Sequence, residues 1–242
     1  MTSKICMIFG LAAGLAWAGA AYATETAGPP VPNTLKAPNP APADTGAHPA
    51  QTGKVAGPPA PFVPIDPQVA IQKANAYFNG TQNMIADFVQ IGGDGRRAEG
   101  KMFVQKPGRL RFEYASPATL DIIADGTTVA VIDRKVGSVQ PYFIWQTPLK
   151  FLLKDQIDLT KDTTVTNVTS DPDNVTIQVE DKQVFGGPTM IKLMFDPTTF
   201  TLKQWQVTDP QGNETLVSLF NQDFTTKPDP SNFQLYQSSS NK

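Results

Sequence analysis

The chain has 242 residues with one cysteine and one histidine, and its 20 basic and 22 acidic side chains leave a net charge of −2. Cys6 and His48 both precede residue 65, so the part that we expect to fold has no thiol and no imidazole. This excludes cysteine and histidine catalysis and the usual zinc sites from that part. We therefore expect that this part binds no metal and no cofactor and that the protein is not an enzyme. The balanced charge argues against nucleic-acid binding.

Residues 1–23 are typical of a cleavable secretory signal. Lys4 supplies the positive charge, an apolar run extends from Ile5 to Ala18, and Ala21-Tyr22-Ala23 offers the small residues that signal peptidases accept. Cys6 lies before the apolar run and is removed with it, so we expect no lipid anchor there. The run is also shorter than the roughly 20 residues of a membrane span. The sequence predicts export as a soluble chain that begins at Thr24.

Residues 24–64 consist mainly of Pro, Ala, Gly and Thr and hold half of the chain's 22 prolines. Such a segment cannot bury enough apolar surface to offset the entropy lost on ordering. We expect an extended, disordered tether, which either gives the domain reach or has no role. Residues 65–242 remain as one folded domain of ordinary size.

The domain opens with a predicted helix. Asp66 is a suitable N-cap and is followed by proline at the first helical position. Apolar residues then recur at spacings of three and four, and the helix is expected to end near Asn79-Gly80. After Met84 the apolar period changes to two. This pattern predicts about eleven short strands, near residues 86–91, 98–106, 109–114, 120–124, 128–133, 138–144, 164–169, 174–180, 190–195, 202–208 and 214–220.

Tight turn signals between the strands, such as Asp125-Gly126, indicate an antiparallel meander. One segment, residues 147–153, breaks the pattern. Thr147 and Pro148 resemble a helix cap and first turn, and large apolar residues follow, so we expect a short helix that cannot lie free in water. The predicted fold is mainly β (α+β), an open antiparallel half-barrel covered by helices. Its inside is either a filled core or a ligand cavity.

With these elements placed, the sequence resembles the periplasmic outer-membrane lipoprotein carrier proteins (the LolA family) from about Val69 to Phe224. The order and spacing of several short motifs carry the resemblance: Asp87-Phe88-Val89-Gln90, Gly100 then Phe103, residues 106–114 with Pro117, Asp125-Gly126, Asp133, Thr147-Pro148-Leu149, and Trp205 with Asp209 and Gly212. It implies an open antiparallel half-barrel with helices over an apolar cavity.

The resemblance also implies a function and partners. The expected protein is a periplasmic chaperone, acting as a monomer, that binds the acyl chains of lipoproteins. It would receive them from an ABC-type release complex in the inner membrane and pass them to an acceptor protein or to the outer membrane itself. Two alternatives stay open, namely a carrier of another envelope lipid or glycolipid and a lipoprotein-sensing regulatory domain. Such sensors usually carry a second domain.

Alternation along the strands suggests which residues face the cavity, as in 109–114, where every second residue is apolar. A one-residue slip inverts such assignments, and each residue could equally be ordinary core. The predicted cavity residues are Leu110, Phe112, Tyr114, Ile123, Val129, Val131, Ile191, Leu193 and Trp205. The predicted lid residues, which refill the cavity when cargo leaves, are Leu149, Phe151, Leu152 and Leu153.

Lys106 is the candidate latch of the lid. Related carriers commonly have a basic pair before the proline of this loop, and the resemblance implies that the second basic residue hydrogen-bonds the closed lid. Here the matching positions are Gln105 and Lys106. Lysine lacks the planar fork of five donors that arginine offers, so a latch made here would be looser. The alternative is a solvated lysine before a turn.

Overall fold

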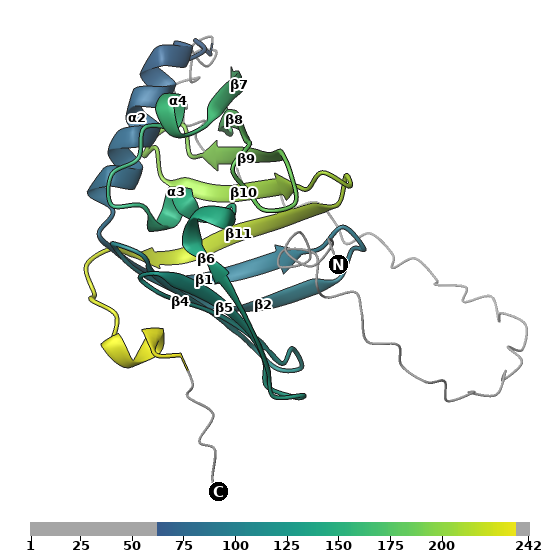
Figure 1. Cartoon of the computed structure of the whole chain (residues 1–242). Coiled ribbons are helices and arrows are strands. Elements are labelled where there is room, and N and C mark those ends of the chain that lie inside the picture. The colour runs from purple at the N-terminus through teal and green to yellow at the C-terminus, as the bar shows by residue number, and fades with distance from the viewer. Residues whose placement is uncertain (1–61, 236–242) are drawn as a thin grey trace, which may run out of the picture. The chain divides into compact units, whose positions relative to one another are not determined.

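The computed structural model describes residues 62–235, so the predicted signal peptide and nearly all of the predicted tether lie outside the described residues. The described part contains one longer helix, two α-helical turns and two 3-10 turns around a sheet (Figure 1): α2 (Pro67–Gly80), α3 (Lys150–Leu153), α4 (Leu159–Asp162), η1 (Ile144–Gln146) and η2 (Pro230–Phe233).

The strands form one antiparallel sheet of eleven members, which confirms the predicted fold class and the number of strands. They are β1 (Asn83–Ile91), β2 (Arg97–Gln105), β3 (Arg109–Tyr114), β4 (Leu120–Asp125), β5 (Thr128–Asp133), β6 (Ser138–Phe143), β7 (Thr164–Ser170), β8 (Val175–Asp181), β9 (Thr189–Phe195), β10 (Leu202–Thr208) and β11 (Glu214–Asp223).

The strand order is β6-β5-β4-β3-β2-β1-β11-β10-β9-β8-β7. Two meanders, β1 to β6 and β7 to β11, are therefore joined side by side by the pairing of β1 with β11. The sheet does not close, and β6 and β7 are its two edges. The chain must cross from one edge to the other between β6 and β7.

Helix α2 begins and ends where the sequence predicts. The Asp66 carboxylate accepts hydrogen bonds from the backbone N–H groups of Gln68 and Val69, at 2.8 and 3.2 Å, which caps the helix. Figure 1 shows α2 beside the half of the sheet that holds β7 to β11. Its buried face consists of Ala70, Ile71, Ala74 and Phe78.

The crossing from β6 to β7 is made by residues 144–163, which we call the lid segment and which contain η1, α3 and α4. A short helix was expected from Thr147, but α3 begins only at Lys150 with Leu149 as its N-cap residue. The Thr147 hydroxyl instead donates to the carbonyl of Ile144 at 2.8 Å, which ends η1. The predicted cap was therefore wrong because the chain makes a 3-10 turn first.

One apolar cluster combines α2, the lid segment and the inward face of strands from both meanders. A second, small cluster of Ile123, Ala130 and Ile132 lies apart from it, with Leu235 packed against it. Since successive side chains of a strand point to opposite faces, the two clusters occupy the two sides of β4 and β5. The main cluster is thus the interior between the sheet and the helices.

Gly100 is required for the close packing of β2. It pairs with Phe88 of β1 and Tyr114 of β3. A Cβ at this position would overlap the backbone oxygen of Glu113 and lie 3.0 Å from a ring carbon of Phe88. Only hydrogen fits there.

We predict that Gly100→Ala lowers the free energy of unfolding by about 1–3 kcal/mol, because backbone atoms must move to admit the methyl group. Urea unfolding followed by circular dichroism measures this change. Gly80→Ala is the matched control, since no atom lies within 4 Å of its added Cβ. Equal stability of the two variants would contradict the packing described for β2.

Candidate functional site

The predicted cavity residues and the predicted lid residues meet in the main apolar cluster. All four lid residues are buried there, with at most 3 % of their surface exposed. Eight of the nine predicted cavity residues belong to the same cluster: Leu110, Phe112, Tyr114, Val129, Val131, Ile191, Leu193 and Trp205. The lid side chains therefore occupy the interior that the sheet residues line.

Ile123 is the exception, because it lies in the small cluster on the other side of the sheet. Its neighbours Ile122 and Ala124 face the main cluster instead. The strand Leu120–Asp125 has three consecutive apolar residues, so alternation gave no basis for choosing a face. The register of β4 against β3, which pairs Ile122 with Phe112, decides it.

Aromatic rings connect the lid to the sheet and to α2. The ring of Phe151 in α3 lies 5.8 Å from that of Trp205 in β10 and 5.6 Å from that of Phe78 in α2, both edge to face. Trp205 in turn lies 6.3 Å from Phe112 in β3. Removing Phe151 from its place would thus expose ring surface on both the sheet and α2.

The turn between β2 and β3 contacts both helices. The Lys106 ammonium donates to the carbonyl of Phe78 in the last turn of α2 at 2.6 Å. The backbone N–H of Gly108 donates to the carbonyl of Leu153, the last residue of α3, at 2.8 Å. Gly108 has a φ of +75° and an added Cβ would lie 2.7 Å from Gly126, so glycine is needed here.

Lys106 thus holds α2 rather than α3, and the lid itself is held by the neighbouring Gly108. The sequence placed the candidate latch in this turn, but it did not predict that Lys106 binds α2. Burial lowers the pKa of the Lys106 ammonium to about 8, although the Asp155 carboxylate in the lid segment partly opposes this shift. The residue is 8 % exposed and so is not a solvated lysine.

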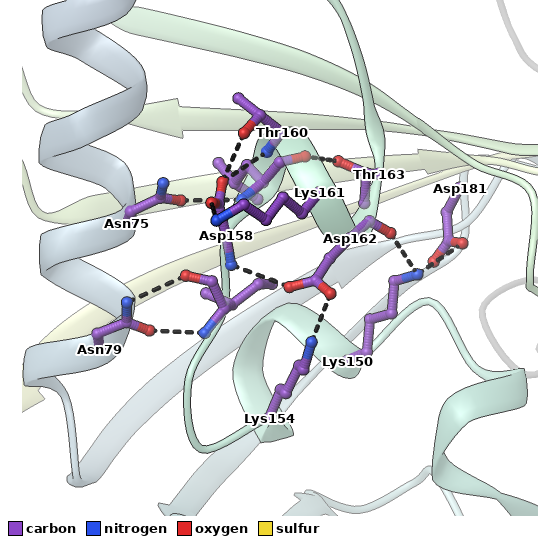
Figure 2. A network of polar contacts seen from close by, with 12 residues as sticks. Asn75, Asn79, Lys150, Lys154, Asp158, Thr160, Lys161, Asp162, Thr163 and Asp181 are labelled. Atoms are coloured by element: carbon purple, nitrogen blue, oxygen red, sulfur yellow. Dashed lines mark hydrogen bonds and ion pairs between the residues drawn. The ribbon is translucent and has the colours of Figure 1, made fainter.

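Polar side chains of α2 hold the second half of the lid segment (Figure 2). The Asn79 amide accepts from the N–H of Ile157 at 2.8 Å and donates to the carbonyl of the same residue at 3.0 Å. One turn earlier, Asn75 accepts from the N–H of Leu159 at 3.0 Å. These bonds satisfy backbone groups of the lid segment that the sheet does not reach.

A buried ion pair fixes α3 to β8. The Lys150 ammonium lies 2.8 Å from an Asp181 carboxylate oxygen and donates to the carbonyl of Asp162 at 2.9 Å. Lys154 pairs with the Asp162 carboxylate nearby, as Figure 2 shows. Sequence reasoning missed this network. The one available signal was Lys150 itself, a charge within an otherwise apolar run, but its partner lies 31 positions away.

Within residues 62–235, no three His, Cys, Asp or Glu side chains are grouped so that they could hold a metal ion. No helix in this part of the chain is long and apolar enough to cross a membrane.

The model of one protein family, described as outer membrane lipoprotein carrier protein LolA, matches residues 79–236, which is more than half of the chain. The chain belongs to this family. The match covers all eleven strands, the lid segment and the turn that carries Lys106. The resemblance noted in the sequence is thereby confirmed.

Two named relatives of this LolA-family chain are outer-membrane lipoprotein carrier proteins. That of Chromobacterium violaceum is 32 % identical over 73 residues, and that of Methylobacillus flagellatus is 30 % identical over 74 residues. The aligned parts cover 29 % and 28 % of this chain and 35 % and 36 % of the relatives. The chain thus spans about a third of the length of each relative.

Solved structures with a similar chain path are more distant. A LolA superfamily protein from Nitrosomonas europaea has 11 % identity and a TM-score of 0.41, covering 71 % of this chain and 98 % of that one. A DUF1329 family protein from Desulfovibrio piger has 10 % identity and a TM-score of 0.43, with 69 % and 96 % covered.

The buried ion pair generates a stability prediction. We expect Lys150→Met to lower the free energy of unfolding by about 3–5 kcal/mol, because it leaves the buried Asp181 carboxylate without its cation. The double variant Lys150→Met/Asp181→Leu should recover most of the loss, since it removes both charges. Urea unfolding of the three proteins measures both effects.

The matched control is Lys101→Met, which removes a lysine from an exposed ion pair with Asp87. We expect it to change the free energy of unfolding by about 1 kcal/mol or less. Similar losses for Lys150→Met and Lys101→Met would show that the Lys150 pair does not hold α3.

The lowered pKa of Lys106 predicts how the free energy of unfolding depends on pH. Its pKa is about 8 in the folded chain, against 10.5 for a lysine exposed to water, so the unfolded chain binds more protons between these values. The contribution of Lys106 to the free energy of unfolding therefore rises with pH across this window. In Lys106→Arg the guanidinium stays charged and this rise is absent.

Urea unfolding of the native protein and of Lys106→Arg, from about pH 7 to about pH 10.5, compares the two slopes. All other groups titrate in both proteins, so the difference reports on residue 106. A difference that stays constant with pH would show that the Lys106 ammonium is not buried against α2.

Proposed function

We propose that this chain is a periplasmic carrier that binds the acyl chains of lipoproteins between the sheet and the lid segment. It receives lipoproteins that a complex of the inner membrane releases and delivers them to an acceptor at the outer membrane. Its role is binding and transport rather than catalysis. Membership of the LolA family and the carrier names of its relatives support this proposal.

The observation that carries the proposal is the shared cluster of lid and sheet. Leu149, Phe151, Leu152 and Leu153 lie in one apolar cluster with residues of both meanders. They reach it from a connection that crosses between the two sheet edges and not from a strand of the sheet. Displacing this connection leaves the sheet intact and opens an apolar interior, which is what an acyl chain needs.

The lid also provides a way to release cargo. Burial of one methylene is worth about 0.8 kcal/mol, so an acyl chain alone would bind too tightly for transfer. When the chain leaves, the four lid side chains return to the same apolar surroundings and recover much of that free energy. The net affinity becomes a small difference between large contributions, and cargo can be passed on without ATP.

The polar contacts give the lid a defined hinge and a defined closed state. Asn75 and Asn79 hold the part around Ile157 and Leu159 to α2. In contrast, α3 is held through the ammonium of Lys150 and through the backbone of Gly108. We propose that α3 moves while the segment anchored on α2 stays. Lys106 then acts as a latch by fixing the end of α2 against the same turn.

The remaining sequence predictions complete the proposal. Residues 1–23 direct export and are removed, residues 24–64 form the tether, and residues 65–242 are the carrier domain. Eight cavity residues and four lid residues line the acyl site. Ile123 lies outside this site.

The direct test is to express the full chain in a Gram-negative host and purify it from the periplasm without detergent. Mass spectrometry then identifies the hydrophobic material that travels with it. We expect acylated lipoproteins, and we expect them to be lost from a variant with the cavity residue Phe112 changed to Glu, because the charge lies on the sheet face that the acyl chain would contact. Free lipid of one class would favour a lipid carrier, and protein without bound material would contradict the proposal.

Competition between lid and cargo predicts whether a mutation in the lid raises or lowers the affinity for an acyl chain. Phe151→Ala should lower the free energy of unfolding by about 3–5 kcal/mol, because Phe151 is buried against Trp205 and Phe78. It should also raise the affinity for a fluorescent acyl probe, about tenfold for each 1.4 kcal/mol by which the packing of the closed lid is weakened. Fluorescence titration measures this affinity.

Phe233→Ala is the matched control. Phe233 is 4 % exposed but lies in η2, outside the main cluster. We expect a similar loss of stability and no gain in probe affinity. A Phe151→Ala protein that binds the probe more weakly than the native protein would show that Phe151 does not compete with cargo.

A further inference from the structure

Three buried side-chain nitrogen or oxygen atoms in the described part of the chain have no hydrogen-bond partner: Arg111 Nε, Asp181 Oδ2 and Trp205 Nε1. Arg111 and Asp181 bind partners through their other atoms, Glu113 at 3.1 Å and Lys150 at 2.8 Å. Trp205 is different, because Nε1–H is its only polar group and can only donate.

No hydrogen-bond acceptor reaches Trp205 Nε1. Its cross-strand neighbours are Leu193 of β9 and Val217 of β11, both fully buried and apolar. The rings nearest to it are those of Phe112 and Phe151. A ring face accepts at most a weak N–H···π contact. A buried donor without an acceptor is destabilising, and phenylalanine would fill similar space without that penalty.

Trp205 lies at the contact between sheet and lid. Phe151, the lid residue that packs against it, is one of the four side chains that leave when the lid opens. An acyl ligand that takes the place of Phe151 therefore comes to lie against the indole of Trp205. The replacement of Phe151 by an acyl ligand rests on the proposed function.

We infer that Trp205 Nε1–H is a specificity determinant that donates a hydrogen bond to an ester carbonyl oxygen of the bound acyl chains. The ester group provides the acceptor that the closed protein lacks. A ligand with alkyl ethers in place of esters has the same length and nearly the same apolar surface but no carbonyl. It leaves the donor unpaired, and a buried polar group left unpaired discriminates strongly between ligands.

Two probes that differ only in this group test the inference. One is a short peptide with an N-terminal S-(dipalmitoyloxypropyl)cysteine, and the other is its dihexadecyl ether analogue, in which each acyl C=O is CH2. We expect the native full chain to bind the ester probe about tenfold more tightly, which corresponds to about 1.4 kcal/mol. Trp205→Phe should reduce this preference to about twofold or less.

Phe151→Leu is the matched control, because it also removes a ring from the same contact but leaves the indole in place. It should keep the tenfold preference. A second readout needs no variant at Trp205: the indole ¹⁵N–¹H resonance of Trp205, assigned as the one that remains when Trp17 and Trp145 are both changed to Phe, should move downfield with the ester probe and not with the ether probe.

The outcomes separate the two proposals. Equal affinities for the two probes in the native protein, an ester preference that persists in Trp205→Phe, or an indole resonance that responds alike to both probes would each overturn the inference while the carrier function stands. Failure of the native protein to bind either probe would overturn the carrier function and this inference with it.

Discussion

The structure depends on one constraint of topology, namely that β6 and β7 lie at opposite edges of an open sheet. The chain between them has to cross the inward face, and the residues that cross it are apolar enough to be buried there. The lid is therefore not an appendage of the sheet but the connection between its two halves. Its apolar side chains complete the core and are, in the proposed function, the groups that cargo replaces.

The same constraint explains why polar groups gather at the ends of the crossing. A connection without a strand partner has backbone groups to satisfy, and Asn75 and Asn79 of α2 bind those around Ile157 and Leu159. Lys150 binds the buried Asp181 carboxylate of β8 and so fixes α3 in one position. These polar contacts give the apolar connection one defined position, which apolar packing alone would not specify.

Much of this could be predicted from the sequence. The cap at Asp66 and the alternation of the strands are local signals, and they gave α2 and all eleven strands. The face of Ile123 could not be predicted, because three consecutive apolar residues carry no alternation and register depends on the neighbouring strand. The partners of Lys106 and Lys150 could not be predicted either, because the fold alone brings Phe78 close to Lys106 and Asp181 close to Lys150.

In the proposed function, the lid segment and an acyl chain exclude one another. The most direct measurement is the distance between spin labels on the exposed positions Lys154→Cys, directly after α3, and Lys101→Cys, in β2, with Cys6→Ser so that no other cysteine is present. Pulsed electron paramagnetic resonance with and without the ester probe gives the two distributions. We predict a shift to longer distances when the probe is bound. Tight probe binding with an unchanged distribution would contradict it.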